Sequence, residues 1–79
     1  MTAQTYNTMA SNLKECLSNR RDYNANMVND MAKRFYNEAE QAPTDKILGL
    51  VAKLNRPNIV STMGDYVRLI VCYEVLATR

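Results

Sequence analysis

The chain has 79 residues, with ten lysines and arginines against eight aspartates and glutamates, which gives a net charge of +2. A chain of this length predicts one domain, residues 1–79, that buries little more than ~60% of the surface its unfolded state exposes. The charge falls short of the basic excess typical of dedicated nucleic-acid binders, and no uninterrupted apolar run reaches the ~18 to 20 residues needed to cross a bilayer.

Two amphipathic helices are predicted in the N-terminal half, because apolar residues recur there at spacings of three and four. The first carries Tyr6, Met9, Ala10, Leu13, Cys16 and Leu17, and the second carries Tyr23, Met27, Val28, Met31, Phe35 and Ala39. The pattern lapses over residues 18–22, where Asn19 can close the first helix in a left-handed conformation and Asp22 can cap the second. We therefore expect a helical hairpin. A continuous helix from about Thr5 to Gln41 is the alternative, because neither glycine nor proline interrupts it.

Two further helices are predicted in the C-terminal half. Pro43 ends the second helix and begins a third, with Asp45 near the positive end of the helix dipole. The third helix carries Ile47, Leu48, Leu50, Val51 and Leu54, with Lys53 and then Arg56 at its basic end. The last helix begins either at Pro57 or at a Thr62 cap that has Asp65 as its partner. Together these segments predict an all-α bundle of three to four helices.

The segment from Asp65 to Arg79 is the most apolar part of the chain. As a helix it is apolar around most of its circumference, so other protein must surround it. Because so short a chain has little with which to do this, we expect self-association, or docking onto a partner, through this helix. The expected oligomer interface comprises Tyr66, Leu69, Ile70, Tyr73 and Leu76. β-Branched and aromatic residues here also favour a strand, which we retain only if two chains pair there.

Arg68 and Glu74 are the charged residues between the two ends of this segment, Asp65 and Arg79. They are six residues apart and do not share a helix face, so each needs a partner from another helix or another subunit. Arg68 either extends to solvent at the rim of the helix or lies at an oligomer interface, where it holds a carboxylate or a bound anion.

The remaining core is predicted from the same periodicity. The residues expected to be buried are Leu13, Leu17, Met31, Phe35, Val51 and Leu54. Cys16 and Cys72 each lie among apolar neighbours, and we expect both to be buried free thiols. The start of the chain lacks the basic and apolar regions of a signal peptide, so the expected location is a reducing compartment, the cytoplasm.

Catalysis is not expected from this composition. The chain contains no histidine, the residue that most often serves as a general base near neutral pH. Its carboxylates fall on polar helix faces or at caps, its serines lack a base partner, and two cysteines without histidines do not make a metal site. We therefore expect a protein that is not an enzyme and uses no metal or cofactor.

Binding is the remaining class of function. The candidate binding residues are Arg20, Arg21, Lys33, Arg34, Tyr36 and Arg68, in which basic pairs stand near a tyrosine. We expect a small protein that inhibits or regulates a protein partner by occlusion, a profile typical of phage and mobile-element accessory proteins. The alternative is a protein that sequesters nucleic acid or nucleotides, with the basic pairs on phosphates and a tyrosine stacked on a base. Interleaved carboxylates such as Asp22 and Glu38 lower the local potential and make this the second choice.

Overall fold

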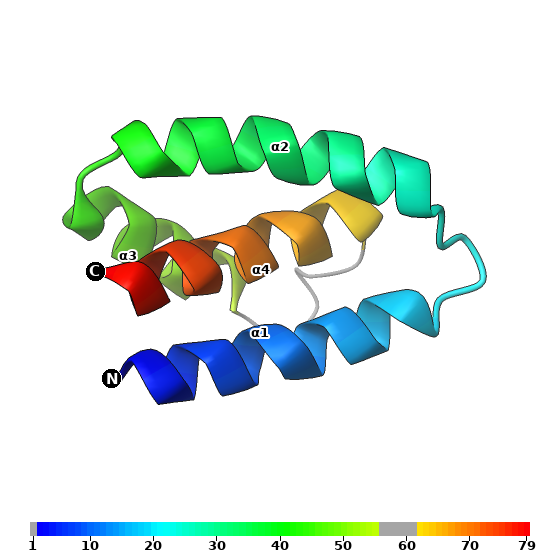
Figure 1. Cartoon of the computed structure of the whole chain (residues 1–79), viewed down its shortest axis with the longest axis horizontal. Helices are drawn as coiled ribbons and strands as arrows, with labels where there is room; N and C mark the ends of the chain where they lie inside the picture. Colours follow the sequence, from blue (N-terminus) through cyan, green and yellow to red (C-terminus); the bar gives the residue numbers. More distant parts are fainter. Residues whose placement is uncertain (1, 56–61) are drawn as a thin grey trace.

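The computed structural model describes residues 2–55 and 62–79, which form helices and their connections. The helices are α1 (Ala3–Ser18), α2 (Ala25–Gln41), α3 (Thr44–Leu54) and α4 (Met63–Thr78). Figure 1 shows α1 and α2 running in opposite directions on either side of α4, with α3 behind the end of α4 where the chain termini lie. The described part of the chain therefore confirms the predicted all-α bundle and contains no strand, so the strand alternative for the C-terminal segment is wrong.

Helix α4 forms the centre of the bundle. Each of α1, α2 and α3 packs against it. Its buried residues are Met63, Val67, Leu69, Ile70, Val71, Cys72, Tyr73, Val75 and Leu76. They lie on all sides of the helix, as predicted, but the protein that surrounds them is the chain's own.

This arrangement buries most of the side chains of the expected oligomer interface within the chain itself. Leu69 and Tyr73 are each 1% exposed, Ile70 and Leu76 are also buried, and Tyr66 is half-buried. These side chains cannot meet a second copy while the three outer helices cover them. Three helices around a fourth suffice to enclose its apolar circumference, so self-association is not needed for that purpose. Whether the chain self-associates through another surface stays a prediction.

The connection between α1 and α2 excludes the continuous helix and differs from the predicted caps. Asn19 has a right-handed backbone conformation, with φ −87°, and not the left-handed one. The cap of α2 is Asn24, whose side-chain oxygen accepts a hydrogen bond from the Met27 backbone N–H at 3.1 Å. Asp22 lies two residues before this cap, and its carboxylate accepts a hydrogen bond from Arg20, with 2.8 Å between Nε and Oδ1.

The predicted boundaries in the C-terminal half are confirmed. α2 ends at Gln41, and Pro43 stands immediately before the first residue of α3. Asp45 and Lys53 lie in the first and last turns of α3, where they suit the helix dipole. Thr62 caps α4 by accepting a hydrogen bond from the Asp65 backbone N–H at 3.2 Å. The alternative start at Pro57 and the basic residue Arg56 lie outside the described residues.

The outer helices contribute fewer fully buried residues than predicted. Leu17 and Leu54 are buried. The other predicted core residues, Leu13, Met31, Phe35 and Val51, are half-buried and pack against the core. Cys16 is exposed, so its predicted burial is wrong, whereas Cys72 is buried as predicted. The reason is geometric: each outer helix touches α4 along a narrow stripe, and a residue next to that stripe keeps one side in water.

Arg79 ties the end of α4 to the end of α2. Its guanidinium donates hydrogen bonds to the carbonyl oxygens of Ala39, Glu40 and Ala42 at 2.9–3.3 Å, and to Thr44 Oγ1 at 3.1 Å. The last carbonyls of a helix have no partner within it and carry the negative end of the dipole. A fixed cation at this position therefore stabilises the α2–α3 connection.

We predict that Arg79→Ala lowers the free energy of unfolding by about 1–3 kcal/mol, because hydrogen bonds from a charged donor are lost. Amide hydrogen exchange should accelerate at Ala42, whose N–H bonds to the Ala39 carbonyl at 3.1 Å. Arg79→Lys keeps the charge but not the planar set of donors. Its free energy of unfolding and its exchange rate at Ala42 should therefore lie between those of the native protein and those of Arg79→Ala. Unchanged exchange at Ala42 in Arg79→Ala would show that these bonds do not hold the connection.

We also predict that Leu69→Ala lowers the free energy of unfolding by about 2–5 kcal/mol, because it leaves a cavity at the centre of the bundle. A chain of this size has a total stability of roughly 4–12 kcal/mol, so the loss is large. Urea denaturation followed by circular dichroism measures it. The matched control is Leu48→Ala on α3, where the leucine is 42% exposed and truncation should change stability by less than about 0.5 kcal/mol. Equal losses at the two positions would contradict the central placement of α4.

Candidate functional site

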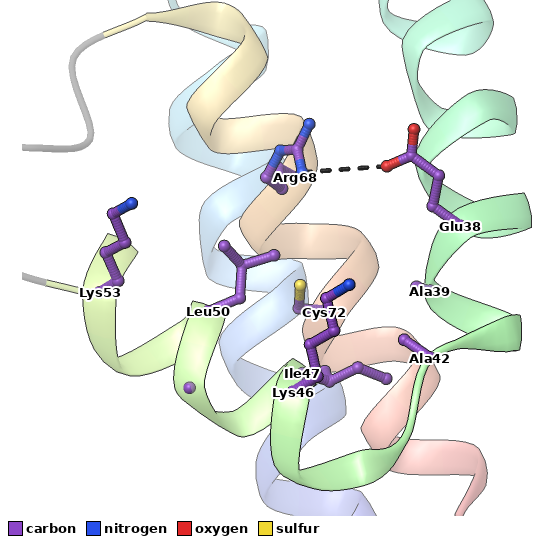
Figure 2. A pocket seen from close by; sticks show the side chains of 10 residues that line it. Glu38, Ala39, Ala42, Lys46, Ile47, Leu50, Lys53, Arg68 and Cys72 are labelled. Carbon is purple, nitrogen blue, oxygen red and sulfur yellow. Dashed lines mark ion pairs between the residues drawn. The ribbon is translucent and has the colours of Figure 1, made fainter.

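The candidate site is a pocket of about 340 Å³ between α2, α3 and α4, hereafter the cationic pocket. Its apolar lining comprises Ala39, Ala42, Ile47, Gly49, Leu50 and Cys72, and its charged lining comprises Glu38, Lys46, Lys53 and Arg68. Figure 2 shows Lys46, Lys53 and Arg68 around the opening, with Leu50 and Cys72 between them. Its volume lies at the small end of the ~300–1,000 Å³ range of ligand sites.

Helix α3 places the two lysines on one side of the pocket. Lys46 and Lys53 are seven residues apart, which is close to two helical turns, so they share a face and stand roughly 10.5 Å apart along the axis. Neither forms an ion pair with any residue of the described part of the chain. Both are exposed and available to an anion from outside.

Gly49 leaves an opening in the wall between the two lysines. A methyl group added there would meet no atom within 4 Å beyond its own helix. Glycine within a helix is about 0.5–1 kcal/mol less favourable than alanine, so α3 is less stable with glycine here than with alanine. The result is a notch into which another molecule can approach the α3 backbone closely.

Arg68 closes the opposite side of the pocket. Its Nη1 lies 3.9 Å from Glu38 Oε2, and its guanidinium carbon lies 4.3 Å from the centroid of the Phe35 ring. Glu74 pairs instead with Lys14 of α1, at 3.3 Å. Both α4 charges thus find partners on other helices, as their spacing predicted, and the partners belong to the same chain. Arg68 is at the rim, with 38% of its side chain exposed.

The charge of the pocket favours an anion with an apolar body. Three cations stand around it against one carboxylate, that of Glu38. Burial raises the pKa of the Cys72 thiol in the floor, and the charge of Arg68 offsets this in part. Cys72 therefore acts as an apolar surface and not as a thiolate nucleophile at neutral pH.

A second groove, of about 320 Å³, lies between α1 and α2 over the other side of α4. Tyr36 lines it, beside the Lys14–Glu74 ion pair. Burial, followed by the neighbouring Glu74 carboxylate, raises the pKa of Tyr36 above its ordinary value, so this side chain stays neutral. Because its cation and its carboxylate compensate each other, this groove offers no charge preference to a ligand.

The structure does not bring the sequence-predicted binding residues together. Arg68 lines the cationic pocket, and Tyr36 lines the second groove. Arg20 and Arg21 lie in the α1–α2 connection, while Lys33 and Arg34 are exposed in the middle of α2.

Arg20 is also engaged within its own connection. It donates two hydrogen bonds to Asp22, at 2.8 and 3.1 Å, and these hydrogen bonds lower the pKa of that carboxyl group. Its guanidinium carbon lies 5.5 Å from the ring centroid of Tyr66.

Lys46, Gly49 and Lys53 are the functional candidates that sequence reasoning missed. The available signal was their spacing: two lysines seven apart on one helix face, with glycine between them where alanine would be more stable. That pattern alone does not place Arg68 opposite, because α4 is separate in sequence.

Within the described residues, no group of histidine, cysteine or carboxylate side chains is placed to hold a metal ion, and no helix combines the length and apolarity required to span a membrane. Comparison with protein-family models, with curated proteins and with solved structures finds no match for this chain.

The two thiols should differ in reactivity. We predict that Cys16, which is exposed, reacts with a thiol reagent at pH 8 at least about tenfold faster than Cys72, because the reactive species is the thiolate and burial raises the pKa of Cys72. The rates are measured separately in Cys72→Ser and Cys16→Ser. In denaturant the two rates should converge. A rapid reaction at Cys72 in the folded protein would mean that α4 is not enclosed.

Proposed function

We propose that this protein is a non-enzymatic binding protein that regulates a protein partner by covering a surface that the partner needs. The observation that carries this proposal is the cationic pocket, in which Lys46, Lys53 and Arg68 surround an apolar floor. In an apolar pocket with a charged rim, apolar contacts at the centre supply most of the binding energy. The charges at the edge orient the partner and select it.

The size of the protein supports occlusion as its mode of action. Its accessible surface is 5275 Å², and a standard interface takes about 800 Å² from each partner. An interface centred on the cationic pocket would therefore use roughly 15% of the surface. The rest of the bundle then blocks access of other molecules to the neighbouring surface of the partner.

The ionisable groups at the pocket favour binding over catalysis. They are two lysines, one arginine and Glu38, whose side chain is 68% exposed. The chain contains no histidine that could supply a base near neutral pH. An exposed free thiol at Cys16 is compatible with a reducing compartment, and we propose the cytoplasm.

The nucleic-acid or nucleotide alternative depends on a nearby tyrosine and on two basic pairs. The pair Arg20 and Arg21 lies in the α1–α2 connection, and the pair Lys33 and Arg34 lies in the middle of α2, so the pairs are separated. A titration of labelled DNA, RNA and nucleotides at two salt concentrations tests it, since each phosphate contact adds about −0.9 to the log–log salt slope on duplex DNA.

The proposed function predicts that peptides exist which bind through the cationic pocket. A display library of random peptides is selected on the immobilised protein, and the selected peptides are measured against Gly49→Leu, which adds a bulky side chain at the wall of the pocket. We expect affinity to fall at least about tenfold in this variant, because the apolar anchor loses its site. Lys33→Glu, on the exposed face of α2, is the control and should leave affinity unchanged. Selection that yields no pocket-dependent peptide would contradict the proposed function.

A further inference from the structure

We infer that the segment held by the cationic pocket is an acidic amphipathic helix of a protein partner, with two carboxylates seven residues apart on either side of an apolar anchor. The inference rests on the proposed function and specifies the chemistry of the partner. It follows from the spacing of Lys46 and Lys53, the opening at Gly49 and the apolar floor between them.

The spacing of the lysines matches a helix and not a strand. Lys46 and Lys53 are roughly 10.5 Å apart along α3, and two carboxylates seven residues apart on a partner helix have the same separation and share a face. In an extended segment, residues on one face repeat every ~6.6 Å, so same-face pairs stand about 6.6 or 13.2 Å apart and neither value fits. The described residues also contain no sheet edge to which an extended segment could add its backbone hydrogen bonds.

The notch at Gly49 allows the two helices to approach. Helices pack with their axes 8–10 Å apart, and the smaller distances require small residues at the contact. Because nothing lies within 4 Å of the position of a Gly49 Cβ, an apolar side chain three or four residues from each carboxylate can enter between the lysines. There it reaches Leu50, Ala39 and the buried Cys72.

Charge complementarity selects an acidic partner. Glu38 is paired with Arg68, which leaves Lys46 and Lys53 without a carboxylate in the described part of the chain. The second groove cannot substitute, because Lys14 and Glu74 already neutralise each other there. The two lysines thus set the register of the partner helix, and the pocket receives its apolar anchor.

The test uses two synthetic helical peptides of identical composition. In the matched peptide, glutamates occupy the fourth and eleventh positions and leucine the eighth, all on one face. In the control peptide, the glutamates move to the sixth and thirteenth positions, which keeps their spacing but places them away from the leucine. Fluorescence anisotropy should give at least about tenfold tighter binding for the matched peptide at low salt, with a smaller difference at high salt.

Charge exchange tests the pairing itself. Lys46→Glu with Lys53→Glu should weaken binding of the matched peptide at least about tenfold, and a peptide with lysines in place of the two glutamates should bind this variant but not the original protein. Lys33→Glu with Arg34→Glu makes the same change in net charge on exposed α2 positions and should leave binding unchanged. Gly49→Ala should reduce the affinity for the matched peptide, and Gly49→Leu, with its larger side chain, should reduce it further. Thermal melting of all four variants checks that the fold persists.

The outcomes separate this inference from the proposed function. Equal binding of the matched and control peptides, or an equal loss from the α2 charge reversal, would overturn the inference. If the display selection then still yields peptides that depend on Gly49, the proposed function stands with a partner of different chemistry. If it yields none, both fail. Tight binding of the matched peptide, lost at Lys46 and Lys53 and restored by the exchanged charges, supports both.

Discussion

The burial of α4 is the constraint on which the rest of the structure depends. A helix that is apolar around its circumference cannot face water on any side, and burying each of its large side chains stabilises the fold by roughly 1.5–3 kcal/mol. Three helices around α4 meet this requirement. Each of α1, α2 and α3 packs a narrow stripe of apolar side chains against α4 and keeps the remainder of its surface polar. The narrowness of those stripes explains why Leu13, Phe35 and Cys16 are less buried than the apolar periodicity predicted.

The same constraint determines where the hollows of the surface lie. Cylinders packed around a central cylinder leave gaps between neighbours, and α4 forms the floor of each gap. Residues of α4 line the cationic pocket, the second groove and a smaller hollow of about 190 Å³ that contains Leu69 and Tyr73. The floors are apolar because α4 is apolar. What distinguishes one hollow from another is the charge that the outer helices place at its rim.

Arg68 and Glu74 connect the central helix to two of these rims. Each is partly exposed and paired with a different outer helix, Arg68 with Glu38 of α2 and Glu74 with Lys14 of α1. Ion pairs at such exposure contribute about 1 kcal/mol or less, so they do not hold the bundle together. They do leave different residual charges, since one rim is neutralised while the other retains Lys46 and Lys53. This difference, more than the similar volumes of the two hollows, singles out the cationic pocket.

The sequence by itself determined the local structure of this protein and the burial of its last helix. Pro43 and Thr62 set helix boundaries through backbone geometry and capping, and the apolar run from Val67 to Leu76 required enclosure whatever surrounded it. The six-residue spacing of Arg68 and Glu74 likewise prevented the two from pairing with each other within one helix. Only the tertiary structure decided that the chain encloses α4 itself, and that α3 brings Lys46 and Lys53 opposite Arg68. Periodicity is a property of one helix, whereas the meeting of two faces depends on how the connections direct each helix around the common centre.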